Sequence, residues 1–364
     1  MALMTVLGLM SGTSMDGVDA AVLVTDGETI GGFGPRLFRS YSLVERDMLR
    51  AAVREARALA DRMARPAALA AAERIVTNAH GEAVERLLAE NSGLNLDLVG
   101  FHGQTVFHAP ARRLTVQIGD GKALARRLGI PVVHDFRAAD VAAGGEGAPL
   151  VPIYHRALAA AAGLTGPVAI VNIGGVANIT RIQADGSLIA GDTGPGNALL
   201  DDFIKARTGA AMDVEGRVAA RGRVDAAVLA RLTANPWFER PMPKSLDRDA
   251  FSLDAVASLS VEDGAATLVA FTSGTIVKGI VISGGAERIV VAGGGASNPT
   301  LMRRLASDAR VPVESAAALG WSPDFLEAEA FAYLAARSTR GLPLTFPGTT
   351  GVPRPTTGGV LARP

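Results

Sequence analysis

The 364-residue chain contains no cysteine, and this absence excludes several kinds of chemistry. Disulfides, thiolate zinc sites, iron–sulfur clusters and thiol nucleophiles all require cysteine. Net charge is also lacking, because 36 Lys and Arg residues balance 36 Asp and Glu residues. Nucleic-acid-binding proteins normally carry a basic stripe, so this balance argues against a nucleic-acid partner.

Targeting and membrane segments are also lacking in the sequence pattern. The first 23 residues have no basic n-region, and Ser11, Thr13 and Asp16 come too early for a secretory apolar region. Residues 157–180 are free of charge and long enough to span a bilayer, but Pro167 and several glycines interrupt them. We therefore expect a cytoplasmic protein with no membrane partner, in which residues 157–180 form a helix end, a turn and two buried strands.

Glycine is abundant: 42 of 364 residues, against a usual share of about 7%. Such an excess indicates many turns with special backbone geometry. The length corresponds to two domains at about 150 residues each, and a chain this long buries a substantial core without disulfides.

The order of predicted elements occurs twice along the chain. In the first half we expect strands at 6–10, 18–24, 37–43, 96–101, 114–118 and 130–133, and helices at 49–63, 67–90, 121–129 and 150–162. In the second half we expect strands at 168–174, 176–182, 187–191 and 287–292, and helices at 197–208, 224–233, 264–279, from 298 onward and at 323–339. After residue 339 a tail rich in Pro, Gly and Thr predicts ordered coil. Two three-strand units, each followed by helices and further strands, predict an α/β protein with two lobes and a central cleft.

Two familiar nucleotide-binding sequence motifs are incomplete in this chain. Gly119–Ala125 (GDGKALA) resembles part of a P-loop, but the first glycine is missing and alanine stands where Ser or Thr must hold magnesium. Gly293, Gly294 and Gly295 follow a predicted strand, but no G-x-G-x-x-G register fits.

Hairpin turns offer another use for glycine. Residues 12–19 (GTSMDGVD) join the first two strands and combine backbone donors, small side chains and two carboxylates. A carboxylate near a phosphate is reasonable if Mg²⁺ or its water shell lies between them, whereas the alternative is an ordinary polar turn. Asn172, Gly174 and Gly175 occupy the corresponding hairpin of the second half, which favours the phosphate interpretation.

Polar residues also gather at the ends of other predicted strands. Asp192 ends a strand in the segment DTGPGN, where it is either a helix N-cap or a rigidly held general base. His102 and His108 match no metal-binding helix spacing. The residues expected to contact a sugar or a carboxylate are Gln104, Thr105, His134 and Arg137.

Together, eight segments between residues 8 and 332 resemble the anhydro-N-acetylmuramic acid kinases. They are GLMSGTSMDGVDAAV, FHGQTVFH, TVQIGDG, HDFRAADVAAGGEGAPLVP, NIGGVANIT, DTGPGN, AGGGASNPTLM and EAEAFA. That family belongs to the sugar kinase, heat-shock and actin superfamily. The resemblance implies a two-lobed actin-like ATPase fold with duplicated βββαβαβα-type units. We expect one lobe in 1–135 plus about 316–364 and the other in 136–315.

The resemblance also implies a reaction: ATP, water and 1,6-anhydro-N-acetylmuramic acid give N-acetylmuramic acid 6-phosphate and ADP, in cell-wall recycling. Asp192 matches the family's catalytic base, which also touches the sugar. The nucleotide-binding residues implied are Gly12, Thr13, Ser14, Met15, Asp16, Gly17, Val18, Asp19, Asn172, Gly174, Gly175, Gly293, Gly294 and Gly295. Asp16 and Asp19 would hold Mg²⁺ directly or through water. The expected sugar ligands are Gln104, Thr105, His134, Arg137, Asp192 and Glu327.

Two other readings stay open. One is a kinase of the same superfamily that phosphorylates a free hydroxyl of another amino sugar. The other is a nucleotide-gated chaperone or filament protein, although two lobes leave no room for an appended peptide-binding domain. The oligomeric state is also open, with a homodimer as one alternative.

Overall fold

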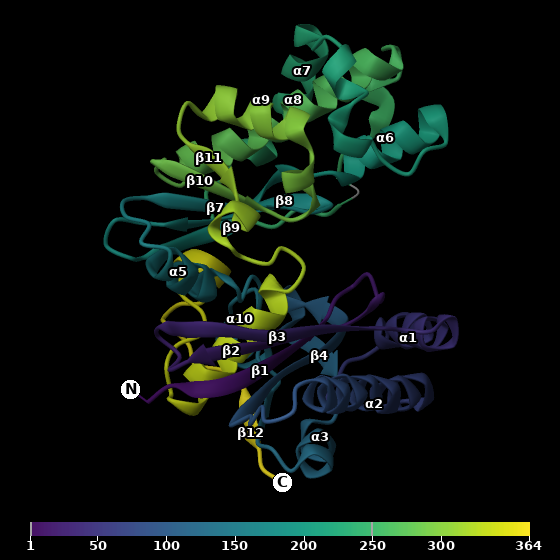
Figure 1. The fold of residues 1–364 in the computed structure, drawn as a ribbon. Coiled ribbons are helices and arrows are strands. Elements are labelled where there is room, and N and C mark those ends of the chain that lie inside the picture. Colours follow the sequence, from purple (N-terminus) through teal and green to yellow (C-terminus); the bar gives the residue numbers. More distant parts are fainter. Residues whose placement is uncertain (1, 249) are drawn as a thin grey trace. The chain divides into compact units, whose positions relative to one another are not determined.

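The computed structural model describes residues 2–248 and 250–364, which form two compact units (Figure 1). Unit 1 comprises Met1–Ala161 and Asp324–Pro364, and unit 2 comprises Ala162–Pro323. The C-terminal segment thus belongs to the same unit as the N-terminal half, and both unit boundaries fall later in the chain than the predicted positions 135 and 316.

The boundary shifts because residues between 136 and 161 pack in unit 1. The Tyr154 hydroxyl donates a hydrogen bond to Glu329 Oε2 over 2.9 Å. Thr350 Oγ1 donates to Asp140 Oδ2 over 2.6 Å. Both bonds join this segment to the C-terminal residues of the same unit, so position 135 is not a division between units.

Unit 1 is built on a seven-stranded sheet in the order β12-β6-β4-β1-β2-β3, with β5 paired to β4. The first three strands are antiparallel, β4 and β6 run parallel to β1, and β12 returns antiparallel to β6. Their bounds are β1 Met4–Ser11, β2 Gly17–Thr25, β3 Ile30–Ser40, β4 Leu98–Ala109, β5 Leu114–Ile118, β6 Val132–His134 and β12 Val360–Ala362.

Unit 2 repeats this arrangement in a five-stranded sheet with the order β11-β10-β7-β8-β9. The first three strands are again antiparallel, and β10 and β11 run parallel to β7. Their bounds are β7 Val168–Ile173, β8 Val176–Ile182, β9 Leu188–Pro195, β10 Arg288–Ala292 and β11 Val313–Ser315. The path β3-β2-β1-β4-β6 therefore has its equivalent in β9-β8-β7-β10-β11, which confirms the predicted duplication.

Helices cover both sheets. Those of unit 1 are α1 Leu43–Ala56, α2 Ala67–Glu90, α3 Gly121–Leu128, α4 Ala138–Ala143, α5 Pro152–Ala161, α10 Leu326–Thr339 and α11 Pro347–Thr350. Those of unit 2 are α6 Ala198–Thr208, α7 Ala226–Thr233, α8 Val261–Ile282 and α9 Pro299–Ala309. Helix α10 lies directly on strands β1 and β4. Glycine at positions 8 and 100 permits this close approach, since a Cβ at either position would collide with the α10 backbone.

Several predicted elements differ from the structure, among them the helix predicted at 49–63, which is α1 at Leu43–Ala56. The third strand ends at Ser40 rather than near 43, because Ser42 and Glu45 form a capping box that starts α1 at Leu43. Strand β4 continues to Ala109, well past Phe101. The tail is not only coil, since it contributes α11 and the sheet strand β12.

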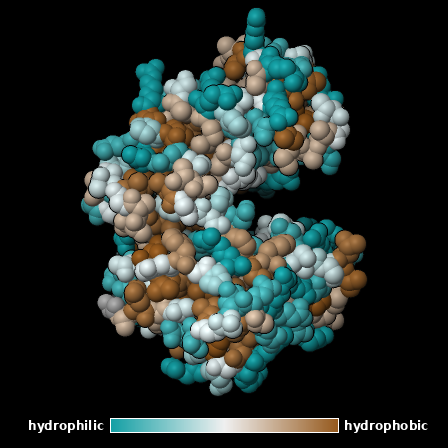
Figure 2. All heavy atoms as spheres, in the orientation of Figure 1, coloured by the Kyte–Doolittle hydropathy of each residue, from teal (hydrophilic) through white to brown (hydrophobic). Residues whose placement is uncertain are grey.

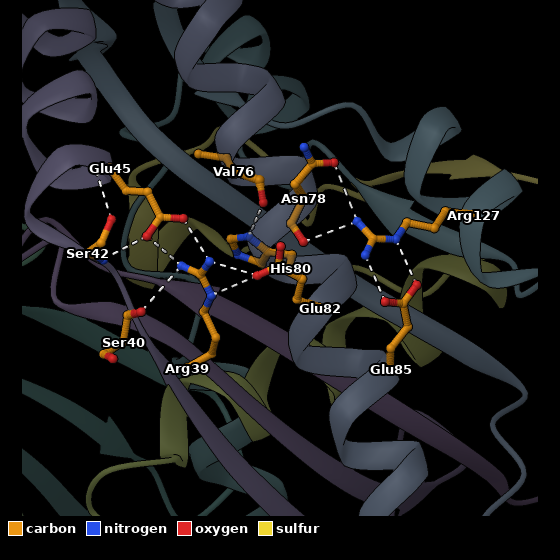
Figure 3. Close-up of polar contacts among 10 residues, drawn as sticks. All are labelled: Arg39, Ser40, Ser42, Glu45, Val76, Asn78, His80, Glu82, Glu85 and Arg127. Carbon is orange, nitrogen blue, oxygen red and sulfur yellow. Dashed lines mark hydrogen bonds and ion pairs between the residues drawn. The ribbon is translucent and has the colours of Figure 1, made fainter.

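An ion-pair network fastens β3 to the helices beside it (Figure 3). The Arg39 guanidinium, from β3, forms a bidentate pair with Glu45 of α1 and also contacts Glu82 of α2 at 2.7 Å. Arg127 of α3 makes a bidentate pair with Glu85 of α2. These contacts connect α1 and α2 to β3, at one edge of the sheet, and α3 to α2.

Among the described residues, α8 is the one helix long and apolar enough to cross a membrane by length and composition. Most of it is buried in unit 2, as expected of a core helix. The charge-free residues 157–180 form the end of α5, a turn, β7 and most of β8, as predicted. Polar and apolar side chains are interspersed over the face drawn in Figure 2.

Candidate functional site

A pocket of about 470 Å³ opens in unit 1 at the turn between β1 and β2. The turn, strand β4, the segment after β6 and the start of α10 form its wall. The lining residues are Met10, Ser11, Gly12, Thr13, Ser14, His102, Thr105, His108, Arg137, Ala148 and Glu327. Its volume is in the range of small-molecule sites.

The β1–β2 turn is held by short-range hydrogen bonds. The Met15 N–H donates to the Gly12 carbonyl over 3.2 Å, and Met15 has a left-handed φ of 54°. Asp16 Oδ1 accepts from Ser14 Oγ at 2.7 Å and from the Gly17 N–H at 3.1 Å. Gly12, Thr13 and Ser14 line the pocket, so the predicted phosphate turn and part of the predicted sugar site lie at one cavity.

Asp19, at the start of β2, has a strongly altered acidity. Burial and, next, the charge of Asp16 raise its pKa to about 7, with smaller effects from Glu327 and Asp324. A divalent cation would relieve this repulsion. Within residues 2–248 and 250–364, no three His, Asp or Glu side chains form a metal-ligand group. The two carboxylates of Asp16 and Asp19 nevertheless suit Mg²⁺, because this ion keeps several waters and binds through one or two carboxylates and substrate phosphates.

Gln104 does not line the pocket, although the sequence predicted a sugar contact for it. Its side chain is fully buried; Oε1 accepts a 2.6 Å hydrogen bond from Ser11 Oγ, and Nε2 donates to the Gly12 carbonyl over 3.0 Å. These bonds support the β1–β2 turn from behind. The placement favours a role in shaping the turn over direct contact with a sugar.

Strand β4 instead presents His102, Thr105 and His108 to the pocket. A regular strand repeats its face every two residues, whereas these residues are three apart. The pairing of β4 shifts register twice, once against β1 between Leu9 and Ser11 and once against β5 between Thr105 and Phe107. Each shift adds one residue to β4, so both histidines join Thr105 on one face. Sequence reasoning missed the histidines as lining residues, because period-two alternation does not reveal a bulge.

Arg137 is fixed in the pocket wall by two hydrogen bonds. Its Nε donates to His102 Nε2 over 3.1 Å, and Nη1 donates to the Gly147 carbonyl over 2.8 Å. Because an arginine only donates, His102 Nε2 must accept, which leaves the proton on Nδ1, 2.8 Å from the Gly103 carbonyl. Burial, followed by the charge of Arg137, lowers the pKa of His102 well below its usual value. His102 is therefore a neutral, oriented partner for Arg137.

Glu327 begins α10 and faces the same pocket as Arg137. Desolvation by the surrounding protein raises the pKa of its carboxyl group, and the charge of Arg137 opposes this effect. The side chain is still exposed to the cavity. The pocket thus offers one cation and one carboxylate, together with the Thr105 hydroxyl. Such a set can recognise a ligand that carries both hydroxyl groups and a carboxylate.

His134 is separated from these residues. It lines a second pocket of unit 1, of about 480 Å³, together with Arg62, Lys122 and Asp135. Burial lowers the pKa of its imidazole. The structure therefore brings Thr105, Arg137 and Glu327 to one cavity and leaves His134 at another.

The predicted glycine turns of unit 2 lie together. The Asn197 N–H donates to the Gly174 carbonyl over 2.7 Å, and the Gly196 N–H donates to the Gly175 carbonyl over 3.0 Å. Gly293 has a φ of 76°, and a Cβ there would collide with Asn172 and the Ile173 carbonyl. The β7–β8 turn, the end of DTGPGN and Gly293–Gly295 thus converge at the carboxyl end of β7.

Asp192 lies within β9, opposite Asn178 of β8. Its Oδ2 accepts a 2.8 Å hydrogen bond from the Leu246 N–H. The N-cap interpretation is wrong, because α6 begins at Ala198 with Asn197 in the cap position. Burial raises the pKa of Asp192 to about 6, and the Leu246 N–H opposes this effect. A carboxylate of this acidity is well suited to accept a proton near neutral pH.

Comparison with known proteins identifies the fold and the family of the chain. A solved xylulose kinase from Lactobacillus acidophilus has the same fold, with a TM-score of 0.52, 10% identity and coverage of 99% of this chain and 94% of that chain. The chain is 54% identical over 374 residues to the anhydro-N-acetylmuramic acid kinase of Methylobacterium nodulans, covering 99% of this chain and 100% of that protein. It is 55% identical over 367 residues to the same-named protein of Rhodopseudomonas palustris, covering 100% of both.

A family model described as anhydro-N-acetylmuramic acid kinase matches residues 4–363. The match includes both units and every predicted site residue. The chain therefore belongs to the anhydro-N-acetylmuramic acid kinase family of phosphotransferases.

Proposed function

We propose that the protein uses ATP, Mg²⁺ and water to convert 1,6-anhydro-N-acetylmuramic acid into N-acetylmuramic acid 6-phosphate and ADP. This activity recycles a fragment of the cell wall, and its need for ATP places it in the cytoplasm. Membership of the family supports the proposal at the level of the reaction. The side chains described above support it at the level of chemistry.

The substrate imposes an unusual requirement. Its O6 is a bridging ether oxygen, which carries no proton for a base to remove. Water must therefore attack C1 and break the C1–O6 bond, while O6 takes the γ-phosphoryl group and ADP departs. The attacking water gives up one proton, so the base must act on water.

Asp192 is the observation that carries this proposal. A 2.8 Å hydrogen bond from the Leu246 N–H to Oδ2 orients its carboxylate. With a pKa of about 6 it is mostly ionised at pH 7 yet basic enough to accept a proton. A carboxylate of ordinary acidity would be a weaker base by about two pH units.

The β1–β2 turn is proposed to bind the ATP phosphates through its backbone N–H groups. Asp16 and Asp19 would hold Mg²⁺, most simply through its water shell. When bound, the ion supplies electrostatic stabilisation to the transferred phosphoryl group. The role of the turn is to orient the phosphates, and Gln104 supports it from behind.

Arg137 is proposed to bind the carboxylate of the lactyl group. Its guanidinium has five N–H donors, of which the bonds to His102 and Gly147 use two. Glu327 is proposed to accept hydrogen bonds from sugar hydroxyl or amide groups, and the Thr105 hydroxyl is proposed to donate a hydrogen bond to the sugar. The planar fork of arginine matches a carboxylate better than the point charge of a lysine.

Isotope labelling tests the proposed reaction. The purified protein is incubated with ATP, Mg²⁺ and the anhydro sugar in ¹⁸O-enriched water, and the product is analysed by mass spectrometry and by NMR at C1. We expect one ¹⁸O at C1 of a 6-phosphorylated product at early times, before sugar mutarotation exchanges that oxygen. Unlabelled early product, or turnover only with sugars that bear a free 6-hydroxyl, would instead indicate a kinase for another amino sugar.

A further inference from the structure

A short segment of unit 2, residues 242–246, runs along the free edge of β9 beside Asp192. The Asp192 N–H donates to the Lys244 carbonyl over 2.8 Å, and the Leu246 N–H donates to Asp192 Oδ2 over 2.8 Å. The segment approaches closely, because a Cβ at Gly191 would lie 3.0 Å from the Lys244 backbone. Asp192 is thus clamped through both its backbone and its side chain.

The clamp is anchored by the side chain of Lys244, which is only 6% exposed. Its Nζ donates to the carbonyls of Trp237 and Phe238 over 3.2 and 3.0 Å and lies 4.3 Å from the centre of the Trp237 ring. Those carbonyls belong to the 3₁₀ turn Pro236–Glu239, and Phe238 is packed in the core of unit 2.

Burial of this ammonium group disfavours its charged form. Burial, followed by the charges of Arg240 and Lys278, lowers the pKa of Lys244, and Glu239 partly opposes them. Lys278 of α8 forms an ion pair with Glu239, which belongs to the same 3₁₀ turn as Trp237 and Phe238. A methionine would fill the same space without desolvating a charge, so the packing alone does not require a lysine.

We propose that Lys244 is a positioning residue for the reaction: its ammonium fixes segment 242–246, and the Leu246 N–H in turn fixes the carboxylate of Asp192. The inference rests on the proposed role of Asp192 as the base. The Lys244 ammonium contacts the Trp237 and Phe238 carbonyls, so we infer that it acts on Asp192 through the backbone.

Steady-state kinetics of Lys244→Met and Lys244→Arg test the proposal, with Lys205→Met as the matched control on an exposed position of α6. We expect Lys244→Met to lower kcat by about tenfold to a hundredfold, since small misplacements of a catalytic group have effects of this order. KM for ATP should stay within twofold. Lys244→Arg, which keeps the donors, should recover most of kcat.

The pH profile separates positioning from a purely structural role. Burial and the Leu246 N–H are the two influences on the pKa of Asp192, and only the N–H lowers it. Loss of that bond must therefore raise the pKa and move the acid limb of the kcat profile to higher pH. An unmoved acid limb in Lys244→Met, or a kcat equal to that of Lys205→Met, would overturn the proposal.

A second pair of variants covers the case in which Lys244→Met does not fold. Leu246→Pro deletes the N–H that binds Asp192, whereas Leu246→Ala removes the side chain and keeps the N–H. The proposal requires a lower kcat and a shifted acid limb in Leu246→Pro but not in Leu246→Ala. Equal kinetics in the two variants would contradict it.

A double-mutant cycle distinguishes this inference from the proposed function. If Asp192→Asn keeps wild-type activity, the base assignment itself is wrong. If Asp192→Asn is impaired and Lys244→Met reduces the activity of that variant no further, Lys244 acts through Asp192. A full additional loss in the double variant would show that Lys244 acts on something else.

Discussion

Arg137 donates a hydrogen bond from Nε to His102 Nε2, and this bond fixes both the arginine in the pocket wall and the proton of the histidine on Nδ1. His102 is buried and has a pKa well below its ordinary value, so it stays neutral at physiological pH. A charged imidazole at this position would repel the guanidinium and could not accept its N–H. The pair is therefore a rigid support for a cation at the pocket.

The first prediction concerns that cation. Arg137→Ala should raise KM for the anhydro sugar by about tenfold to a hundredfold, the range expected for hydrogen bonds to a charged group. KM for ATP should change little. Arg137→Lys should not restore binding, because a lysine lacks the planar fork that binds a carboxylate through two parallel N–H groups. The measurement is initial rates at varied sugar concentration, and an unchanged KM in Arg137→Ala would rule out the assignment.

The second prediction concerns Asp192. Asp192→Asn should lower kcat by about 10²- to 10⁴-fold, the usual contribution of a general base. Calorimetric titration with a non-hydrolysable ATP analogue should give nearly wild-type affinity. Near-normal turnover in the variant would remove the proposed role.

The acidity of Asp192 gives a third prediction. Its folded pKa of about 6 lies above the ordinary aspartate value of 3.8, so the folded protein keeps a proton that the unfolded chain releases between these two pH values. This group therefore makes the free energy of unfolding decrease as pH rises from about 4 to 6. For the same reason kcat should fall below about pH 6, where the base becomes protonated.

Asp192→Asn is the control for the effect on the free energy of unfolding. The pH dependence of its unfolding free energy should lack this contribution, as measured by urea unfolding at several pH values. If the variant and the wild type change in parallel between pH 4 and 6, the pKa of Asp192 is not raised.

Much of the fold was predictable because local signals agree with it. Helix α2 occupies Ala67–Glu90 as predicted, with Pro66 as its N-cap, and β8 has the predicted bounds 176–182 because a glycine turn precedes it. The repeated order of elements was also sufficient to predict the duplicated sheets. These features depend on residues close together in the sequence.

The arrangement of the site was less predictable, because it depends on contacts distant in sequence. Gln104 is a polar residue in a motif, yet its bonds to Ser11 and Gly12 turn it away from the pocket. The two bulges of β4 bring His102 and His108 to the cavity, and no local pattern reveals them. Lys244 lies 52 positions from Asp192, so its connection to the base appears only in three dimensions.

The fourth prediction separates two roles for Gln104. Gln104→Met leaves the Gly12 carbonyl and the Ser11 hydroxyl without this partner, at a cost of about 1–3 kcal/mol in stability. Because the turn is proposed to hold phosphates, KM for ATP should rise. Affinity for the anhydro sugar, measured by calorimetry without nucleotide, should stay close to wild type. A selective loss of sugar affinity would instead support direct contact, and Gln183→Met serves as a control for the substitution itself.

The last prediction contrasts the two glutamates of the segment EAEAFA. Glu327 faces the pocket, whereas Glu329 is fully buried and binds Arg36 at 2.7 Å and the Tyr154 hydroxyl at 2.9 Å. Glu329→Ala leaves these partners unpaired. Because Arg36 is 30% exposed and can be rehydrated, we expect a loss near the lower end of the range for broken buried pairs, about 3 kcal/mol.

Glu327→Ala should do the opposite: stability within about 0.5 kcal/mol of wild type, as for other open positions, but altered kcat and sugar KM. Urea unfolding followed by circular dichroism and steady-state kinetics on the folded fraction measure the two effects separately. A stable Glu329→Ala, or a Glu327→Ala that loses stability with unchanged kinetics, would contradict this division. The outcome depends on helix geometry, since residues two apart on a helix point to different sides, so the structural and ligand-facing glutamates can stand in one short motif without sharing a role.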